Sequence, residues 1–220
     1  MLVLPFWLSI ALVMSVDAQT KLLFVRHGES LANVNPDIRF QSDYSDHNVA
    51  LSPRGREQAT SCKCFFSERL YKAEADRLKY WSSPMRRAIE TAHIIVPTTA
   101  IDNIVVDADL REMEWPRFET QDERAHHKAG IKAHGMFRYK KLDSKAETGE
   151  DVAKRLTHFL MRHKQALNDQ TNIIFCHELV MRAFQYLVRR DPTVFDTIEY
   201  DNCEVAVWTG SLDALVNMEI

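Results

Sequence analysis

The chain has 220 residues, of which 45% are hydrophobic, and it contains only 6 glycines and 7 prolines. This composition is typical of a globular protein with one core, and it excludes a disordered or low-complexity chain. The formal net charge of −3 argues against a broad basic surface for nucleic acid or an anionic membrane, so a bound anion must be held by a local group of cations.

The N-terminal segment is predicted to be a signal peptide. Residues 2–16 form an uncharged run that is short for a membrane span, and Val16 and Ala18 suit cleavage by a signal peptidase. We therefore expect residues 1–18 to be removed from a secreted protein and residues 19–220 to form one domain. Because no Lys or Arg precedes the apolar run, an uncleaved anchor, a misassigned start and a cytoplasmic location remain open.

Strand-like apolar runs then alternate with segments of helical periodicity. Strands are predicted at residues 21–26, 78–82, 104–106, 172–176 and 205–208, and helices from Pro53 as far as about Leu70, from Pro84 to about Ile95, and over 147–167 and 179–188. Residues 28–47 and 114–145 are expected to be irregular, the second segment forming a solvated surface or a lid. The alternation predicts an α/β sheet covered by helices on both faces.

The four cysteines, at positions 62, 64, 176 and 203, are too few for a scaffold built on disulfides. Cys62 and Cys64 are two residues apart in a predicted helix and point to different faces, which makes them a poor metal pair. We expect buried or free thiols, with any pairing left open.

Polar residues follow three of the predicted strands directly. They are Arg-His-Gly-Glu at 26–29, Ser-Ser-Pro-Met-Arg-Arg at 82–87 and Cys-His-Glu at 176–178. In open α/β sheets ligands bind beyond the carboxyl ends of the strands, so these residues are expected to meet there. Two histidines and several arginines at one edge indicate a site for an anionic group.

Five motifs carry a resemblance to a known family. They are RHGES at 26–30 with Asn33, SSPMRRAIETA at 82–92, LREMEW at 110–115, AETGEDVAKRL at 146–156 and IIFCHELVMRAF at 173–184. In this order they resemble the histidine phosphatase superfamily, in its phosphoglycerate mutase-like branch. The resemblance covers residues 21–209 and implies that residues 19–220 form a histidine phosphatase domain. It also implies a doubly wound, mostly parallel sheet with helices on both faces and the site at its carboxyl edge.

The resemblance also implies roles for individual residues. His27 is similar to the nucleophile and His177 to the second histidine of the pocket, while Arg26 and Arg87 match the arginines that grip the phosphoryl group. Glu112 matches the proton donor. Asn33 matches a position that contacts phosphate, as His177 also does, and Glu147 matches an acidic position whose role we interpret as structural.

The chemistry of these residue types fits the implied roles. A neutral imidazole is a competent nucleophile, and its attack on phosphorus divides hydrolysis into transfer and dephosphorylation. Guanidinium groups, together with a second histidine that we expect to be cationic, are suited to hold the charge of the transferring group. A carboxylic acid can protonate the departing alkoxide if burial or nearby negative charge raises its pKa.

Two residues depart from the family pattern. Glu178 and Pro116 stand where the family usually has Gly.

The sequence does not support a metal site. A zinc peptidase motif starting at His177 fails because its fifth position is Met181. Three further histidines lack the carboxylate and cysteine partners of a convincing metal site; they are His126, His127 and His134.

The sequence therefore predicts a phosphatase that hydrolyses a phosphomonoester through a phosphohistidine. It is expected to need no metal or other cofactor, and to act on a small phosphorylated substrate or a phosphoprotein. No nucleic-acid partner is expected, nor stable membrane association once the signal is cleaved. The alternatives are a phosphoglycerate mutase-type phosphotransferase and a catalytically weak phospho-ligand binding protein. Leu31 and Ala32, which replace a Trp-containing stretch of typical mutases, and the short segment after Glu112 favour the phosphatase.

Overall fold

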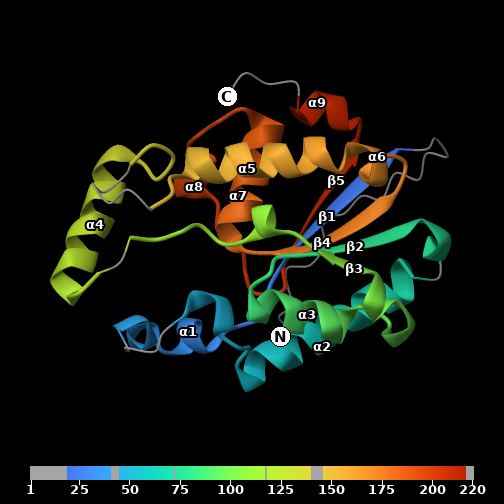
Figure 1. The fold of residues 1–220 in the computed structure, drawn as a ribbon, viewed down its shortest axis with the longest axis horizontal. Helices are drawn as coiled ribbons and strands as arrows, with labels where there is room; N and C mark the ends of the chain where they lie inside the picture. Colours follow the sequence, from blue (N-terminus) through green and yellow to red (C-terminus); the bar gives the residue numbers. More distant parts are fainter. Residues whose placement is uncertain (1–18, 41–44, 72, 117, 140–145, 217–220) are drawn as a thin grey trace, which may run out of the picture.

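A computed structural model of the chain describes residues 19–40, 45–71, 73–116, 118–139 and 146–216 (Figure 1). The predicted signal peptide, residues 1–18, lies outside the described residues. The strands are β1 (Thr20–Arg26), β2 (Leu78–Ser82), β3 (Ile104–Val106), β4 (Thr171–Cys176) and β5 (Val205–Gly210). The α-helices are α1 (Leu31–Val34), α2 (Pro53–Arg69), α3 (Arg86–Ile95), α4 (Gln121–His134), α5 (Gly149–Arg162), α6 (Lys164–Leu167), α7 (Glu178–Arg189), α8 (Val194–Thr197) and α9 (Leu212–Val216). Of these described helices, none is long and apolar enough to cross a bilayer.

The strands form one sheet in the order β3-β2-β4-β1-β5. β1, β2, β3 and β4 run parallel to one another, and β5 is antiparallel to its neighbour β1. Each strand predicted from the sequence is present, with bounds that differ by at most two residues. The predicted α/β class, with a mostly parallel sheet, is confirmed.

Helices cover both faces of the sheet, because alternate residues of a strand point to opposite sides. On β1, Leu22 and Phe24 belong to a hydrophobic cluster with α5, α7 and α9, whereas Leu23 and Val25 belong to a second cluster with α2 and α3 (Figure 1). The ring of Phe24 stacks on Phe184 of α7 with 4.4 Å between centroids. Truncating a buried ring of this kind costs roughly 3–5 kcal/mol, so these clusters hold the sheet rigid beneath its polar edge.

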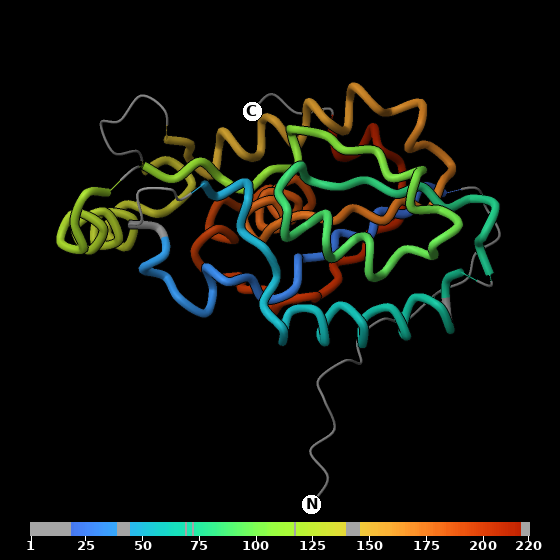
Figure 2. The backbone as a smooth tube through the Cα atoms, turned by 60° about the horizontal axis from the view of Figure 1, so that its bottom comes forward, coloured from blue at the N-terminus to red at the C-terminus, as the bar shows by residue number. Residues whose placement is uncertain are grey.

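Residues 114–145 differ from the prediction, because part of this segment is the helix α4. Thr120 caps its first turn by accepting from the Glu123 N–H, and Gly135 ends it with a φ of 78°, a conformation that glycine adopts without strain. The polar composition concealed these two signals. Figures 1 and 2 both place α4 at one end of the molecule, beyond the carboxyl edge of the sheet.

The long helix predicted over residues 147–167 also differs in detail. It begins at Gly149, after a capping box between Thr148 and Asp151, and His163 separates it into α5 and α6. The imidazole of His163 lies 2.7 Å from the Asp107 carboxylate, which holds it at the break between the helices. The four cysteines are free thiols, as expected, and two of them, Cys176 and Cys203, are buried.

The ends of β1, β4 and β2 are joined to one another by backbone hydrogen bonds. The His27 N–H donates to Cys176 O at 3.0 Å, and the Ser83 N–H donates to Phe175 O at 2.9 Å. Beyond β1 the backbone packs directly against the first turn of α2, where a side chain on Gly28 would overlap the backbone of Gly55. These contacts fix the chain on both sides of the first histidine.

Candidate active site

His27 is buried at the end of β1, with 4% of its surface exposed. Its Nδ1 lies 2.7 Å from Gly28 O, and its Nε2 receives a hydrogen bond from Arg87 Nε at 3.2 Å. A guanidinium can only donate, so Nε2 carries the lone pair and Nδ1 carries the proton. Burial and the charge of Arg87 hold the pKa of His27 well below its usual value. The imidazole is therefore neutral at pH 7, with Nε2 as its basic atom.

His177 lies beside His27, with 5.1 Å between the ring centroids, and is fully buried. Its Nε2 is 2.8 Å from Ser83 Oγ, which also accepts from the Met85 N–H. Its Nδ1 is buried and has no hydrogen-bond partner among the described residues. Burial and the charge of Arg87 hold the pKa of His177 well below its usual value, so the expectation of a cationic second histidine is wrong for the free protein.

Arg87 stands in the first turn of α3 and is 5% exposed. Besides Nε on His27, its terminal nitrogens donate to the Asp46 carboxylate at 3.2 and 3.1 Å and to Asp46 O at 2.8 Å. Asp46 belongs to a short 3-10 helix, η2 (Asp46–Asn48), in the segment that was expected to be irregular. The arginine thus joins the first histidine to an acid that the sequence did not single out.

Arg26 contacts groups different from those that Arg87 contacts. Its Nη2 lies 2.9 Å from Glu178 Oε2, its Nη1 donates to Tyr200 O, and its Nε is buried without a hydrogen-bond partner in the described ranges. Its charge lowers the pKa of both His27 and His177, so it lies within electrostatic reach of each ring. Glu178, which replaces the usual Gly, therefore neutralises Arg26 and also pairs with Arg182.

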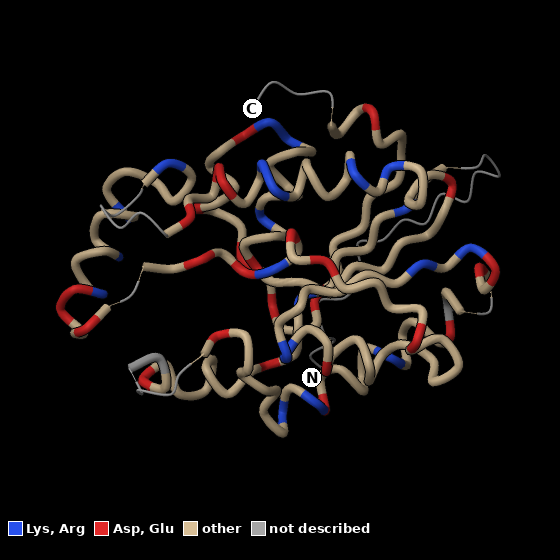
Figure 3. The backbone as a smooth tube through the Cα atoms, viewed as in Figure 1, with Lys and Arg blue, Asp and Glu red and all other residues tan. Residues whose placement is uncertain are grey.

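A cavity of about 490 Å³ opens beside Arg26. Its lining is mostly acidic and consists of Arg26, Glu178, Glu199, Tyr200, Asp201 and Glu204. Figure 3 shows acidic and basic residues interspersed along the described backbone. The cations of the site are thus local, as the net charge of the chain predicts.

Glu112 is half-buried in the segment after β3. Its Oε1 accepts from the Met113 N–H at 2.9 Å. Burial raises the pKa of Glu112 above its usual value, against the lowering effect of that hydrogen bond and of the Arg87 charge, and Asp46 raises it further. The carboxyl group therefore lies within electrostatic reach of Arg87 and keeps its proton to a higher pH than an exposed Glu.

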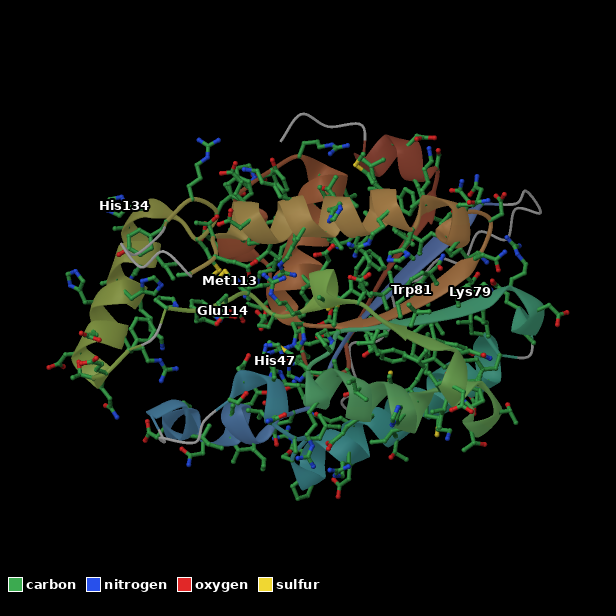
Figure 4. All side chains as sticks on the ribbon, in the orientation of Figure 1. His47, Lys79, Trp81, Met113, Glu114 and His134 are labelled. Carbon is green, nitrogen blue, oxygen red and sulfur yellow. The ribbon has the colours of Figure 1, made fainter. Side chains whose placement is uncertain are left out.

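Glu147 binds the segment on both sides of Glu112. Its carboxylate accepts from Arg111 at 2.5 Å and from the Glu114 N–H at 2.9 Å, and it is paired with the buried Arg155 at 3.0 Å. In Figure 4, Glu114 lies at the same end of the sheet as His47, the neighbour of Asp46, and Lys79 at the start of β2 lies at the opposite end. These contacts agree with a structural role for Glu147.

Asn33 is exposed on α1, where its Oδ1 closes a capping box with Ser30 at 3.0 Å. The box uses only the carbonyl oxygen of the amide, so a role in phosphate binding falls to Nδ2. Pro116, the second departure from the family pattern, is buried beyond Glu112.

Two residues were missed by sequence reasoning. Ser83 stands inside a quoted motif, and its position after β2 was the signal that could have identified it. Asp46 offered no such signal, because it lies in a polar segment 41 residues from its partner Arg87.

Within the described ranges, no group of three or more His, Cys, Asp or Glu residues is placed to hold a metal ion. The predicted residues His27, His177, Arg87 and Glu112 do come together at the carboxyl edge.

Comparison with known sequences agrees with this geometry. The family model described as "Histidine phosphatase superfamily (branch 1)" matches residues 22–214. The human 6-phosphofructo-2-kinase/fructose-2,6-bisphosphatase 4 is 28% identical over 173 residues, which are 78% of this chain and 33% of that protein. A chicken protein, 6-phosphofructo-2-kinase/fructose-2,6-bisphosphatase, is 29% identical over 159 residues, 72% of this chain and 30% of its own length. The match thus spans about a third of each of these relatives.

Solved structures share the fold at lower sequence identity. Phosphoserine phosphatase of Entamoeba histolytica, in complex with 3-phosphoglyceric acid, has a TM-score of 0.64 at 19% identity, with 86% of this chain and 89% of that chain covered. A mycobacterial glucosyl-3-phosphoglycerate phosphatase has a TM-score of 0.68 at 18% identity, with 90% and 95% covered. The family model matches residues 22–214, which is most of the sequence, so the chain belongs to the histidine phosphatase superfamily.

Proposed function

We propose that the protein is a phosphatase that hydrolyses a phosphomonoester through a phosphohistidine on Nε2 of His27. The observation that carries this proposal is the tautomer of His27, set by Gly28 O on one side and Arg87 Nε on the other. A neutral imidazole whose lone pair is directed at a guanidinium can attack a phosphoryl group that the same guanidinium holds, once that group replaces the hydrogen bond from Arg87 Nε.

The other groups of the site supply charge and protons. Arg87, Arg26 Nε and His177 Nδ1 would donate to the phosphoryl oxygens, and buried donors without partners are the groups that a bound anion satisfies. Glu112, whose pKa is raised, would protonate the departing oxygen and then accept a proton from the attacking water. We propose that these cationic and donor groups make a metal ion unnecessary.

The substrate is proposed to be a small phosphate ester. The relatives and structural neighbours are named for fructose 2,6-bisphosphate, phosphoserine and glucosyl-3-phosphoglycerate, so sugar phosphates and phosphoamino acids are the first classes to test. Inositol phosphates and phosphoproteins belong in the same panel. We further propose that residues 1–18 direct the protein into the secretory pathway, which expression of the full chain and N-terminal sequencing of the secreted product would test.

The test of function is phosphate release from this panel by the purified protein, together with a phosphoglycerate mutase assay. Release of inorganic phosphate with negligible mutase activity is the expected result. Transfer between the carbons of phosphoglycerate without net phosphate release would instead favour the mutase, and binding without turnover would favour a phospho-ligand binding protein.

A further inference from the structure

The hydrogen-bond donors of Arg87 are all used by the protein itself. A guanidinium has five N–H bonds. Nε donates to His27 Nε2 at 3.2 Å, Nη1 donates to Asp46 O and Oδ1 at 2.8 and 3.2 Å, and Nη2 contacts Asp46 Oδ2 at 3.1 Å and Met85 Sδ at 3.2 Å. Five donors therefore meet five acceptors, and Asp46 supplies three of them.

The Asp46 carboxylate binds Arg87 as an oxyanion ligand would. Its two oxygens contact the two terminal nitrogens, which is the paired geometry that carboxylate and phosphate groups share on a guanidinium. The arginine side chain is 6% exposed and the aspartate side chain 31% exposed. Arg87 is thus the more deeply buried partner, and Asp46 lies nearer to solvent.

We infer that Asp46 competes with the phosphoryl group of the substrate for Arg87 and so determines how tightly the site binds phosphate. This inference rests on the proposed function, in which a phosphoryl group must reach both His27 Nε2 and the terminal nitrogens of Arg87. Since the Asp46 carboxylate occupies the paired position on both terminal nitrogens of Arg87, a phosphoryl group that binds them in the same way must displace it. The apparent dissociation constant is the intrinsic one divided by the fraction of molecules in which Arg87 is free, so removing Asp46 lowers it.

The test is titration calorimetry of the purified protein with inorganic phosphate, which needs no turnover. Asp46→Asn preserves the size of the side chain and the backbone carbonyl, and Asp46→Ala removes both carboxylate oxygens. We expect the alanine variant to bind phosphate at least about tenfold more tightly than wild type, because a charge-assisted competitor is lost, and the asparagine variant to lie between them. Inhibition by vanadate should strengthen in the same order.

Asp37→Asn is the matched control, because Asp37 is an exposed acid on the same polar segment, in η1 (Pro36–Phe40), and its contact is to Gln121. It removes the same charge, so its phosphate affinity should stay within about twofold of wild type. If Asp37→Asn increased the affinity for phosphate as much as the Asp46 variants do, the cause would be the change in net charge, and the inference would be overturned. Unchanged or weaker phosphate binding by both Asp46 variants would also overturn it, since weaker binding would mean that Asp46 holds Arg87 in place for the ligand.

Phosphate release from esters, measured in parallel, separates this inference from the proposed function. If the wild-type protein hydrolyses esters but its Asp46 variants bind phosphate no more tightly, the proposed function stands and competition by Asp46 is refuted. Tighter binding by the variants of a protein without hydrolase activity supports the competition and refutes the hydrolase.

Discussion

Arg87 Nε lies 3.2 Å from Nε2 of His27, so the arginine donates to the one imidazole nitrogen that carries no proton. Gly28 O engages the other nitrogen at 2.7 Å. The two contacts select one tautomer, and burial together with the positive charge of Arg87 lowers the pKa of the imidazole and keeps it neutral. A phosphoryl group entering between the two side chains would meet a nucleophile and a cation that are already aligned.

Replacing His27 by Ala should abolish turnover, by at least about a thousandfold, because the imidazole forms the covalent bond to phosphorus. His27 belongs to neither of the two hydrophobic clusters on the faces of the sheet, so circular dichroism should show a folded protein. Mass spectrometry of a quenched wild-type reaction should find acid-labile phosphate on His27. His158→Ala, on the exposed surface of α5, is the matched control and should stay active. Substantial phosphatase activity in the His27 variant would refute its role as nucleophile.

Replacing Glu112 by Gln should slow the hydrolysis of an alkyl phosphate much more than that of a nitrophenyl phosphate. The alkoxide needs a proton to depart, so the rate on the alkyl phosphate should fall by about a hundredfold or more, whereas the phenolate departs without a proton. Rapid-quench measurement of phosphohistidine formation would separate this step from hydrolysis. Equal losses of Glu112→Gln on both substrates would show that Glu112 positions the site instead of donating a proton. The same two substrates applied to Glu114→Gln and Glu178→Gln would show whether either of these neighbouring acids is the proton donor.

The rate on an alkyl phosphate should rise as the pH is lowered from about 8 toward 5. His27 has a pKa well below its usual value, so it stays neutral as the pH falls through this range, and the nucleophile is retained. Glu112 has a raised pKa and acts as an acid only when protonated, so activity is lost as the pH rises through that pKa. The profile of kcat/KM for Glu112→Gln should lack this alkaline limb. An unchanged profile would assign the limb to another group.

Replacing Glu147 by Gln should reduce the acid step without removing it, because Glu147 positions the segment that carries Glu112. We expect kcat on an alkyl phosphate to fall by roughly tenfold, with a smaller change on nitrophenyl phosphate and little change in KM. Glu150→Gln on the surface of α5, which pairs with Lys154, is the matched control. Equal losses of kcat on both substrates would indicate general disruption of the fold rather than misplacement of Glu112.

Chelators should leave activity unchanged, because Arg87 and Arg26 supply the positive charge for the phosphoryl group and His177 supplies a further donor. Vanadate should inhibit, since its five-coordinate form resembles the transferring group. The measurement is a rate assay after exhaustive dialysis against EDTA. Loss of activity that zinc or magnesium restores would contradict metal independence.

Much of the fold and most of the site could be predicted from the sequence. The strands are short apolar runs that end at charged or polar residues, and this local pattern located His27, the motif before Arg87, and His177 at strand ends. Parallel strands must end at one edge of a sheet, so the sequence alone predicts that these residues, which are far apart in the chain, lie close together. Helix α4 was not predicted, because its residues are mostly polar and its capping residues resemble those of a loop.

The sequence by itself determined which residues are candidates for the reaction, since its motifs contain His27, Arg87, Glu112 and His177 in this order. Only the tertiary structure decided how those groups are paired and charged. Asp46 reaches Arg87 across 41 residues, and this contact has no local signature, because loop conformation depends on what the loop packs against. Burial likewise belongs to the assembled fold, which is why His177 is neutral in the free protein, although the need to hold the phosphoryl charge had suggested a cation.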